Sequence, residues 1–145
     1  YVAQVSMANS AKLYKALLDG LEYRGTAFFQ SYTTCQPEHG VGDNMAMQQS
    51  KLAVDTRTFP VLMYDPRKGD KIAQRLSLQG NPSEKTDFFI EPKTNEVYDF
   101  IRFAKTEGRF AKHFDKDGNP SDTLLRATQR RLDNWRLSQE PAGII

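Results

Sequence analysis

Cysteine is almost absent from this sequence: Cys35 is the only one in 145 residues. One thiol excludes an internal disulfide framework, and it excludes a multi-thiolate metal site built by this chain alone. So low a count is typical of a reducing compartment, so we expect a cytoplasmic setting. If Cys35 has a chemical role, most of that site must lie outside this chain.

Long hydrophobic runs and a strong charge of either sign are also missing. The longest apolar runs, such as residues 61–64, are far shorter than the roughly 18 residues of a membrane-spanning helix, and the start shows no cleavable signal pattern. The 20 basic and 18 acidic residues give a net charge of +2, which is too even to indicate nucleic acid as a partner. We therefore expect neither a membrane nor a nucleic acid among its partners. Because the chain starts at Tyr1, we expect a piece of something longer.

Hydrophobic periodicity predicts alternating strands and helices in the first half. Strands are expected over residues 2–5, 26–32 and 59–64. Helices are expected over 10–21, capped by Asn9 or Ser10, and over 45–55. The first helix carries an apolar stripe at helical spacing, formed by Tyr14, Leu17, Leu18 and Leu21. One side of the second helix is mixed and holds Met45, Gln49, Leu52 and Ala53.

This order predicts an α/β fold: a partial doubly wound parallel sheet (βαβαβ), followed by a loop-rich excursion and C-terminal helices. We divide the chain into 1–67, half of an α/β domain, and 68–145, a loop-rich extension with helices near 97–104 and 122–139. Three strands make a thin sheet, so we expect something else to cover its edge.

Cys35 comes where the expected second strand, which is predicted to be buried, ends and a loop begins. In an open parallel sheet, ligands bind at the carboxyl ends of the strands. His39 follows four residues later, so a nucleophile with its base, or two metal ligands, are open interpretations beside an inert thiol and a solvent-facing imidazole. Residues 40–44 (GVGDN) could hold an anion, but a tight turn with Asp43 or Asn44 as helix cap explains them as well. A thiamine diphosphate motif is rejected there, since Asp70 stands about where its asparagine is needed.

Other polar patterns favour structural interpretations. Residues 115–119 (DKDGN) lack the remaining ligand positions of a calcium loop and predict a plain turn. The last helix has a basic face diluted by acidic residues, which is typical of a solvated surface. Its apolar face is expected to hold Leu124, Leu125, Thr128, Leu132 and Trp135, with Trp135 as a core or docking residue.

Several ordered segments resemble pyruvate:ferredoxin (flavodoxin) oxidoreductases. They are residues 1–7 (YVAQVSM), 22–29 (EYRGTAFF), 31–35 (SYTTC) with His39 and Gly40, 49–54 (QSKLAV), 59–67 (FPVLMYDPR), 80–82 (GNP), 103–104 and 109–110. The resemblance extends in order over most of the chain and is strongest over residues 1–67.

The resemblance implies the C-terminal part of the thiamine-diphosphate-binding domain of such an enzyme. The whole enzyme would oxidatively decarboxylate a 2-oxoacid, with pyruvate as the expected substrate, to acyl-coenzyme A, with electrons passing through [4Fe-4S] clusters to ferredoxin or flavodoxin. Cys35 is implied as the fourth ligand of one cluster, and so as both a metal ligand and a cofactor-binding residue. The ligands of thiamine diphosphate and Mg²⁺ are expected upstream of Tyr1.

The expected partners are thus the remaining domains or subunits, a second protomer in a homodimer, the electron acceptor, coenzyme A and the 2-oxoacid. No catalytic residue is assigned, and the chain by itself is not expected to be active. Two alternatives stay open. One is a non-catalytic interaction module in which Cys35 is buried and inert. The other is a Cys–His hydrolase or transferase.

Overall fold

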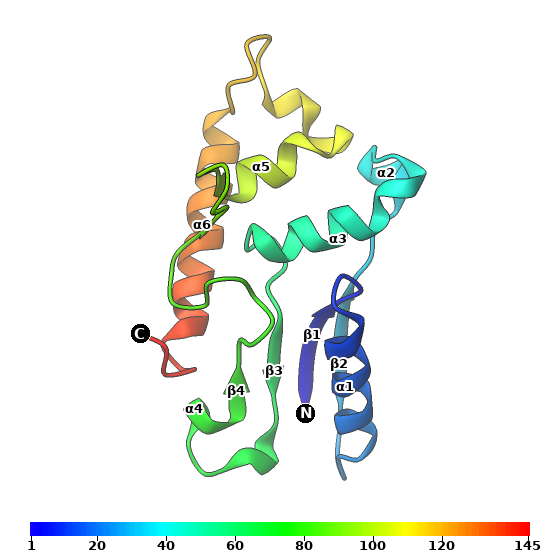
Figure 1. The fold of residues 1–145 in the computed structure, drawn as a ribbon, viewed down its shortest axis with the longest axis vertical. Helices are drawn as coiled ribbons and strands as arrows, with labels where there is room; N and C mark the ends of the chain where they lie inside the picture. The colour runs from blue at the N-terminus through cyan, green and yellow to red at the C-terminus, as the bar shows by residue number, and fades with distance from the viewer.

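Strands and helices alternate in the first half of the chain, and helices dominate the second half, in the computed structural model of residues 1–145 (Figure 1). The α/β class is confirmed. The first half contains β1 (Val2–Ser6), α1 (Ser10–Leu21), β2 (Phe28–Tyr32), α2 (Gln36–His39), α3 (Ala46–Asp55) and β3 (Leu62–Tyr64). The second half contains α4 (Ile72–Arg75), β4 (Leu76–Ser77), β5 (Phe89–Ile90), β6 (Val97–Tyr98), α5 (Phe100–Lys105) and α6 (Asp122–Gln139). Short 3-10 helices cover 43–45, 66–68 and 108–113.

The main sheet has the strand order β2-β1-β3-β4 and is mixed. β1 and β2 are parallel, with Val2 opposite Phe28 and Ser6 opposite Tyr32. β1 and β3 are antiparallel, as are β3 and β4. The parallel βαβ unit was predicted correctly for β1, α1 and β2. The prediction of a second parallel crossover into β3 is wrong.

The direction of β3 follows from where α3 lies. A parallel crossover needs a helix that packs on a face of the sheet and returns the chain to its starting end. Figure 1 shows α3 crossing the end of the sheet instead, near the carboxyl ends of β1 and β2. The chain therefore enters β3 from that end and runs back along β1. Arg57, just after α3, adopts a left-handed φ of 59° at this reversal.

The helix α1 packs on the sheet through small residues. Ala16 and Gly20 are its buried positions, and the ring of Phe29 lies so close to Gly20 that a Cβ there would be 2.2 Å from Phe29 Cζ. The side chains of the predicted apolar stripe point away from this contact. Tyr14, Leu17, Leu18 and Leu21 are exposed, Leu21 by 81%. The prediction of the helix is correct, but the prediction of its buried face is wrong.

β2 forms an edge of the sheet and is not the buried strand that the sequence predicts. None of its five residues is buried, and Phe28 is 58% exposed. A small cluster behind the sheet holds this half together: Tyr1, Ala3, Val5, Ala16 and Met63 are its buried members. The aromatic character of β2 therefore did not predict burial within this chain.

The helices α3, α5 and α6 form the helical half of the fold, which has a separate core; β1, α1, β2 and β3 form the sheet half. Ala53 of α3, Phe100, Phe103 and Ala104 of α5, and Leu124 of α6 form the helical core, with Tyr32, Phe59 and Phe110 packed around them. On α6 the predicted apolar face is confirmed for Leu124, Leu132 and Trp135, whereas Leu125 is 47% exposed. Ser121 caps α6 as its side chain accepts from the Leu124 amide. None of the helices is both long and apolar enough to cross a membrane.

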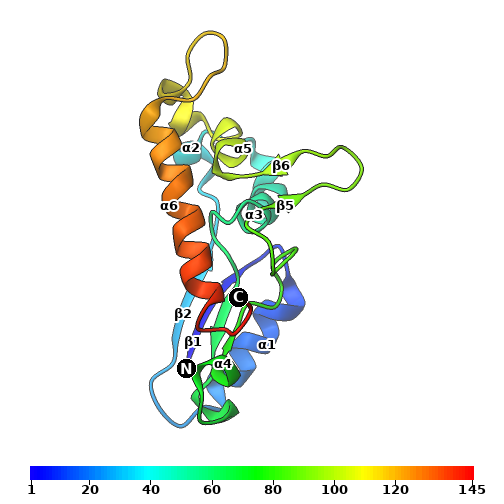
Figure 2. The same ribbon diagram turned by 90° about the vertical axis from the view of Figure 1, so that its left-hand side faces the viewer.

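The predicted loop-rich excursion is held in place by buried polar groups. Asn81 accepts a hydrogen bond from the Val61 amide at 2.7 Å and donates to the carbonyls of Val61 and Leu78. Arg57 lies over the Trp135 ring at 3.9 Å and donates to the carbonyls of Pro82 and Ser83. The strand β4 and the hairpin of β5 and β6, which projects from the molecule in Figure 2, were not predicted. The helix expected near 97–104 begins only at Phe100, because Val97 and Tyr98 pair with β5 as the strand β6.

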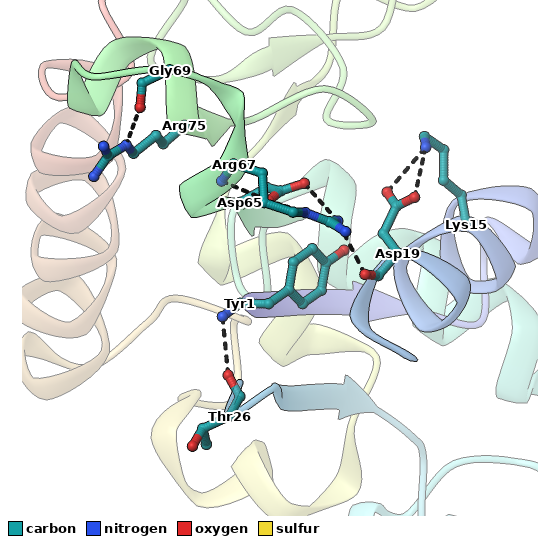
Figure 3. Close-up of polar contacts among 8 residues, drawn as sticks. All are labelled: Tyr1, Lys15, Asp19, Thr26, Asp65, Arg67, Gly69 and Arg75. Carbon is teal, nitrogen blue, oxygen red and sulfur yellow. Dashed lines mark hydrogen bonds and ion pairs between the residues drawn. The ribbon is translucent and has the colours of Figure 1, made fainter. Parts of the chain in front are cut away.

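The turn after β3 is tied to α1 at the other end of the sheet, as Figure 3 shows. The Arg67 guanidinium donates to both oxygens of Asp65, each at 2.9 Å, and to the carbonyl of Asp19 at 3.1 Å. These donors hold the pKa of the Asp65 carboxyl below its usual value. Lys15 pairs with Asp19 one turn earlier on α1.

Candidate functional site

Cys35 lies three residues beyond the end of β2, at the same end of the sheet as the carboxyl end of β1. It precedes α2 in an extended conformation, its thiol is exposed, and its carbonyl accepts a hydrogen bond from the His39 amide at 2.9 Å. The thiol is therefore presented by a short, well-defined helical turn. This chain itself does not bury the thiol, whereas the interaction-module alternative expected a buried cysteine.

The loop that follows Cys35 packs directly on the backbone of residues 107–109. Gly40 ends α2 with a left-handed φ of 63°, and its carbonyl accepts from the Gly108 amide at 3.3 Å. A Cβ at Gly40 would lie 2.8 Å from Gly108 Cα, closer than carbon atoms can approach. Two glycines thus let two chain segments, far apart in sequence, meet without a side chain between them.

Glu107 is the buried charge at this contact. Its side chain is fully buried, and its Oε1 accepts from the Tyr32 hydroxyl at 3.1 Å and from Gln49 Nε2 at 3.0 Å. His39 Nδ1 lies 3.3 Å from the same oxygen, close enough for an ion pair but outside good hydrogen-bond geometry. Arg109 Nε donates to Oε2 at 2.5 Å. The carboxylate therefore joins the end of β2, the Cys35 loop and α3.

The orientation of this network follows from its other hydrogen bonds. The Thr106 hydroxyl donates to Gln49 Oε1 at 3.0 Å, which turns the nitrogen of that amide toward Glu107. The Tyr32 ring packs edge-on against Phe103, and beside Phe59 and His39. Burial, with the negative charge of Glu107 as the second cause, raises the pKa of Tyr32 to about 12. Tyr32 is therefore a neutral hydrogen-bond donor to Glu107 at physiological pH.

The structure separates the two predicted members of a Cys–His pair. His39 is only 15% exposed in its side chain, so the expectation of a solvent-facing imidazole is wrong. Its Nδ1 faces Glu107, and no hydrogen bond joins the imidazole to the Cys35 thiol. The geometry does not supply the base that a Cys–His hydrolase needs.

The loop of residues 40–44 is a turn without the predicted side-chain cap. Neither Asp43 nor Asn44 caps α3: they lie in a 3-10 helix over Asp43–Met45, and Met45 stands at the cap position of α3 with no side-chain hydrogen bond. The structure has no group of three or more His, Cys, Asp or Glu side chains that could hold a metal ion.

The predicted turn at residues 115–119 is confirmed. Asp115 accepts hydrogen bonds from the amides of Asp117 and Asn119 and from the Asn119 side chain. These bonds lower the pKa of Asp115. Its carboxylate oxygens are used inside the turn.

Sequence reasoning missed Glu107. The residue lies in a polar stretch between two segments, 103–104 and 109–110, that carry the family resemblance. A glutamate between Thr106 and Gly108 shows no periodicity that marks it as buried, because three of its partners, Tyr32, His39 and Gln49, come from distant segments. The one available signal was the pairing of Glu107 with Arg109, two residues on.

Comparison with known proteins places the chain beside large pyruvate-oxidising enzymes. No family model matches the sequence. The chain is 28% identical over 99% of its length to a pyruvate-flavodoxin oxidoreductase of Rhodospirillum rubrum, of which it covers 11%. It is 32% identical over 76% of its length to a pyruvate dehydrogenase [NADP(+)] of Cryptosporidium parvum, of which it covers 6%.

A further match is the pyruvate:ferredoxin oxidoreductase of Moorella thermoacetica, 32% identical over 46% of the chain and covered to 6%. The chain therefore spans about a tenth or less of the length of these relatives. The comparisons confirm the resemblance that the ordered motifs predicted: this chain is similar to part of the pyruvate:ferredoxin and pyruvate-flavodoxin oxidoreductases.

Proposed function

We propose that this chain is a segment of a 2-oxoacid oxidoreductase, and that Cys35 is its ligand to a [4Fe-4S] cluster. The observation that carries the proposal is the similarity over 99% of the chain to a pyruvate-flavodoxin oxidoreductase, together with an exposed thiol at the carboxyl end of the parallel strand pair. The complete enzyme would convert a 2-oxoacid, pyruvate in the first instance, to acyl-coenzyme A and reduce ferredoxin or flavodoxin.

The residues of this chain fit one quarter of such a site. A [4Fe-4S] cluster is normally held by four cysteine thiolates and transfers one electron at a time. Cys35 is the one thiol present, and its exposure lets it reach a group held by other segments. The three other ligands, and those of thiamine diphosphate and Mg²⁺, would come from the rest of the enzyme.

The role of this chain's own residues is then to position the thiol. β1 and β2 end at the same end of the sheet, and Cys35 lies there, directly before α2. Residues 1–67 would complete the cofactor-binding domain and residues 68–145 would extend it. A cytoplasmic setting and a homodimer remain predictions that accompany this assignment.

The proposal is tested by the iron and acid-labile sulfide content and by electron paramagnetic resonance of the complete protein. Cys35→Ala is compared with wild type and with Thr33→Ala, an exposed hydroxyl residue of the same segment. We expect Cys35→Ala to remove or convert one cluster signal, with up to about four fewer iron atoms per chain, while Thr33→Ala keeps all of them. An unchanged iron content and spectrum in Cys35→Ala would overturn the ligand assignment.

A further inference from the structure

We propose that Glu107 is the positioning residue of the Cys35 loop, an anchor that fixes where the thiol is presented. This inference rests on the proposed function for the identity of what Cys35 binds, but the anchoring itself is a property of this chain. Glu107 does not contact the thiol. It acts through His39 and through the contact of Gly40 with Gly108.

The first step of the argument is the location of the charge. The carboxylate of Glu107 is fully buried, at a place where three segments meet. An ionised carboxylate in such a place is tolerated only when donors surround it. Here Tyr32, Gln49 and Arg109 donate to its two oxygens, and His39 Nδ1 lies 3.3 Å from one of them.

The second step is what these partners have in common. Tyr32 ends the strand that leads to Cys35, and His39 ends the helical turn that follows it. In sequence, Cys35 thus lies between Tyr32 and His39, and the side chains of both lie against the Glu107 carboxylate. Gln49, on α3, fixes the far side of the loop.

The third step is that the loop has few other attachments. The residues of α2 are all unburied, and the hydrogen bonds made by the amides of His39, Gly40 and Val41 stay within the loop. The backbone bond from Gly108 to Gly40 is the link from the neighbouring residue of Glu107 to the loop. Apart from the packing of His39 beside the Tyr32 ring, the loop therefore depends on residues 107 and 108 for its place on the rest of the fold.

The test uses Glu107→Gln in the complete protein, which keeps the shape of the side chain and removes its charge. The matched control is Glu38→Gln, which removes the same charge from an exposed site on the same loop. Hydrogen exchange of the peptide covering residues 36–44 measures how firmly the loop is held. We expect Glu107→Gln to accelerate exchange there on the order of tenfold, since buried donors lose a charged acceptor, and Glu38→Gln to leave it unchanged.

A redox titration followed by electron paramagnetic resonance is the second readout. The signal to follow is the one that Cys35→Ala removes. Loss of a buried negative charge near the loop is expected to make its midpoint potential more positive, because adding an electron then meets less repulsion. The iron content should stay at the wild-type value, and the Glu38→Gln midpoint should stay close to wild type, because that charge is screened by solvent.

The outcomes separate this inference from the proposed function. If Cys35→Ala leaves every cluster intact, the ligand assignment fails, while loop exchange in Glu107→Gln still decides the anchoring. If Cys35→Ala removes a cluster but Glu107→Gln leaves both exchange and midpoint at wild-type values, the anchoring is wrong. If Glu107→Gln does not fold, His39→Leu removes the loop's own contact with the carboxylate; unchanged exchange over residues 36–44 in that variant would equally overturn the inference.

Discussion

The two halves of this molecule use similar numbers of buried apolar residues to very different effect. The sheet half buries a five-residue cluster behind β1, but α1 and β2 leave large apolar side chains in solvent, Leu21 and Phe28 among them. The helical half also has five buried residues, with seven partly buried hydrophobic residues packed against them, Tyr32, Phe59, Phe110 and Phe114 among them, whereas four pack against the sheet cluster. The helical half therefore encloses its core more fully than the sheet half does.

The Cys35 loop lies at the junction between the two halves. Tyr32 belongs to the sheet and packs in the helical core, and Glu107 links it to the Cys35 loop. At this junction the more fully packed helical half supports the Cys35 loop, while the sheet half leaves apolar side chains exposed. Substitutions in the two halves should therefore lower the free energy of unfolding by very different amounts.

The largest effect is expected in the helical core. Phe103 has no exposed surface and packs against Tyr32 and Phe100. Phe103→Ala should lower the free energy of unfolding by about 3–5 kcal/mol, because it leaves a cavity that the core cannot fill. Leu125→Ala, at the exposed position on α6, should cost less than about 1 kcal/mol. Urea unfolding of the 145-residue chain measures both, and equal losses would contradict the boundary of this core.

The next effect concerns the glycine contact under the Cys35 loop. Gly40 and Gly118 both have a left-handed φ, but an added Cβ meets Gly108 at position 40 and nothing within 4 Å at position 118. Gly118→Ala should cost about 1–2 kcal/mol from backbone strain. Gly40→Ala should cost at least about 1 kcal/mol more, because the two backbones must separate. The same unfolding experiment compares them, and a smaller loss at Gly40 would show that the loop does not rest on Gly108.

These positions also show what the sequence could predict. Local signals were enough for the boundaries of α1 and α6, for the Asn9 cap and for the turn at Asp115, because each depends on residues close in sequence. The direction of β3, the burial of His39 and the role of Glu107 could not be predicted. They depend on α3 crossing the end of the sheet, which no periodicity records.

A smaller effect is expected at the turn that joins β3 to α1. Because Arg67 lowers the pKa of Asp65, the ionised carboxylate stabilises the fold above its unfolded pKa of about 3.9. That contribution is lost as the pH falls through the lower pKa of the folded state. Asp65→Asn should therefore be less stable than wild type from pH 7 to 5, with the difference shrinking in more acidic solution.

The control for this prediction is Asp70→Asn, an exposed carboxylate on the same turn without an ion pair. Its stability should follow that of the wild type across the same pH range. Thermal unfolding as a function of pH measures all three proteins. A difference between Asp65→Asn and wild type that stays constant down to pH 2 would mean that the Asp65 charge is not what Arg67 stabilises.

The smallest effect is expected on the open side of α1, where it sharpens the comparison most. Leu21 is 81% exposed and Ala16 has no exposed surface on the same helix. In the 145-residue chain, Leu21→Gln should change the free energy of unfolding by less than about 0.5 kcal/mol, whereas Ala16→Leu should cost about 1–3 kcal/mol by overpacking. A large loss of stability for Leu21→Gln in this chain would show that Leu21 is buried, as the periodicity predicted. A loss confined to the complete protein would instead show that another segment covers α1, so the sheet half would be completed from outside.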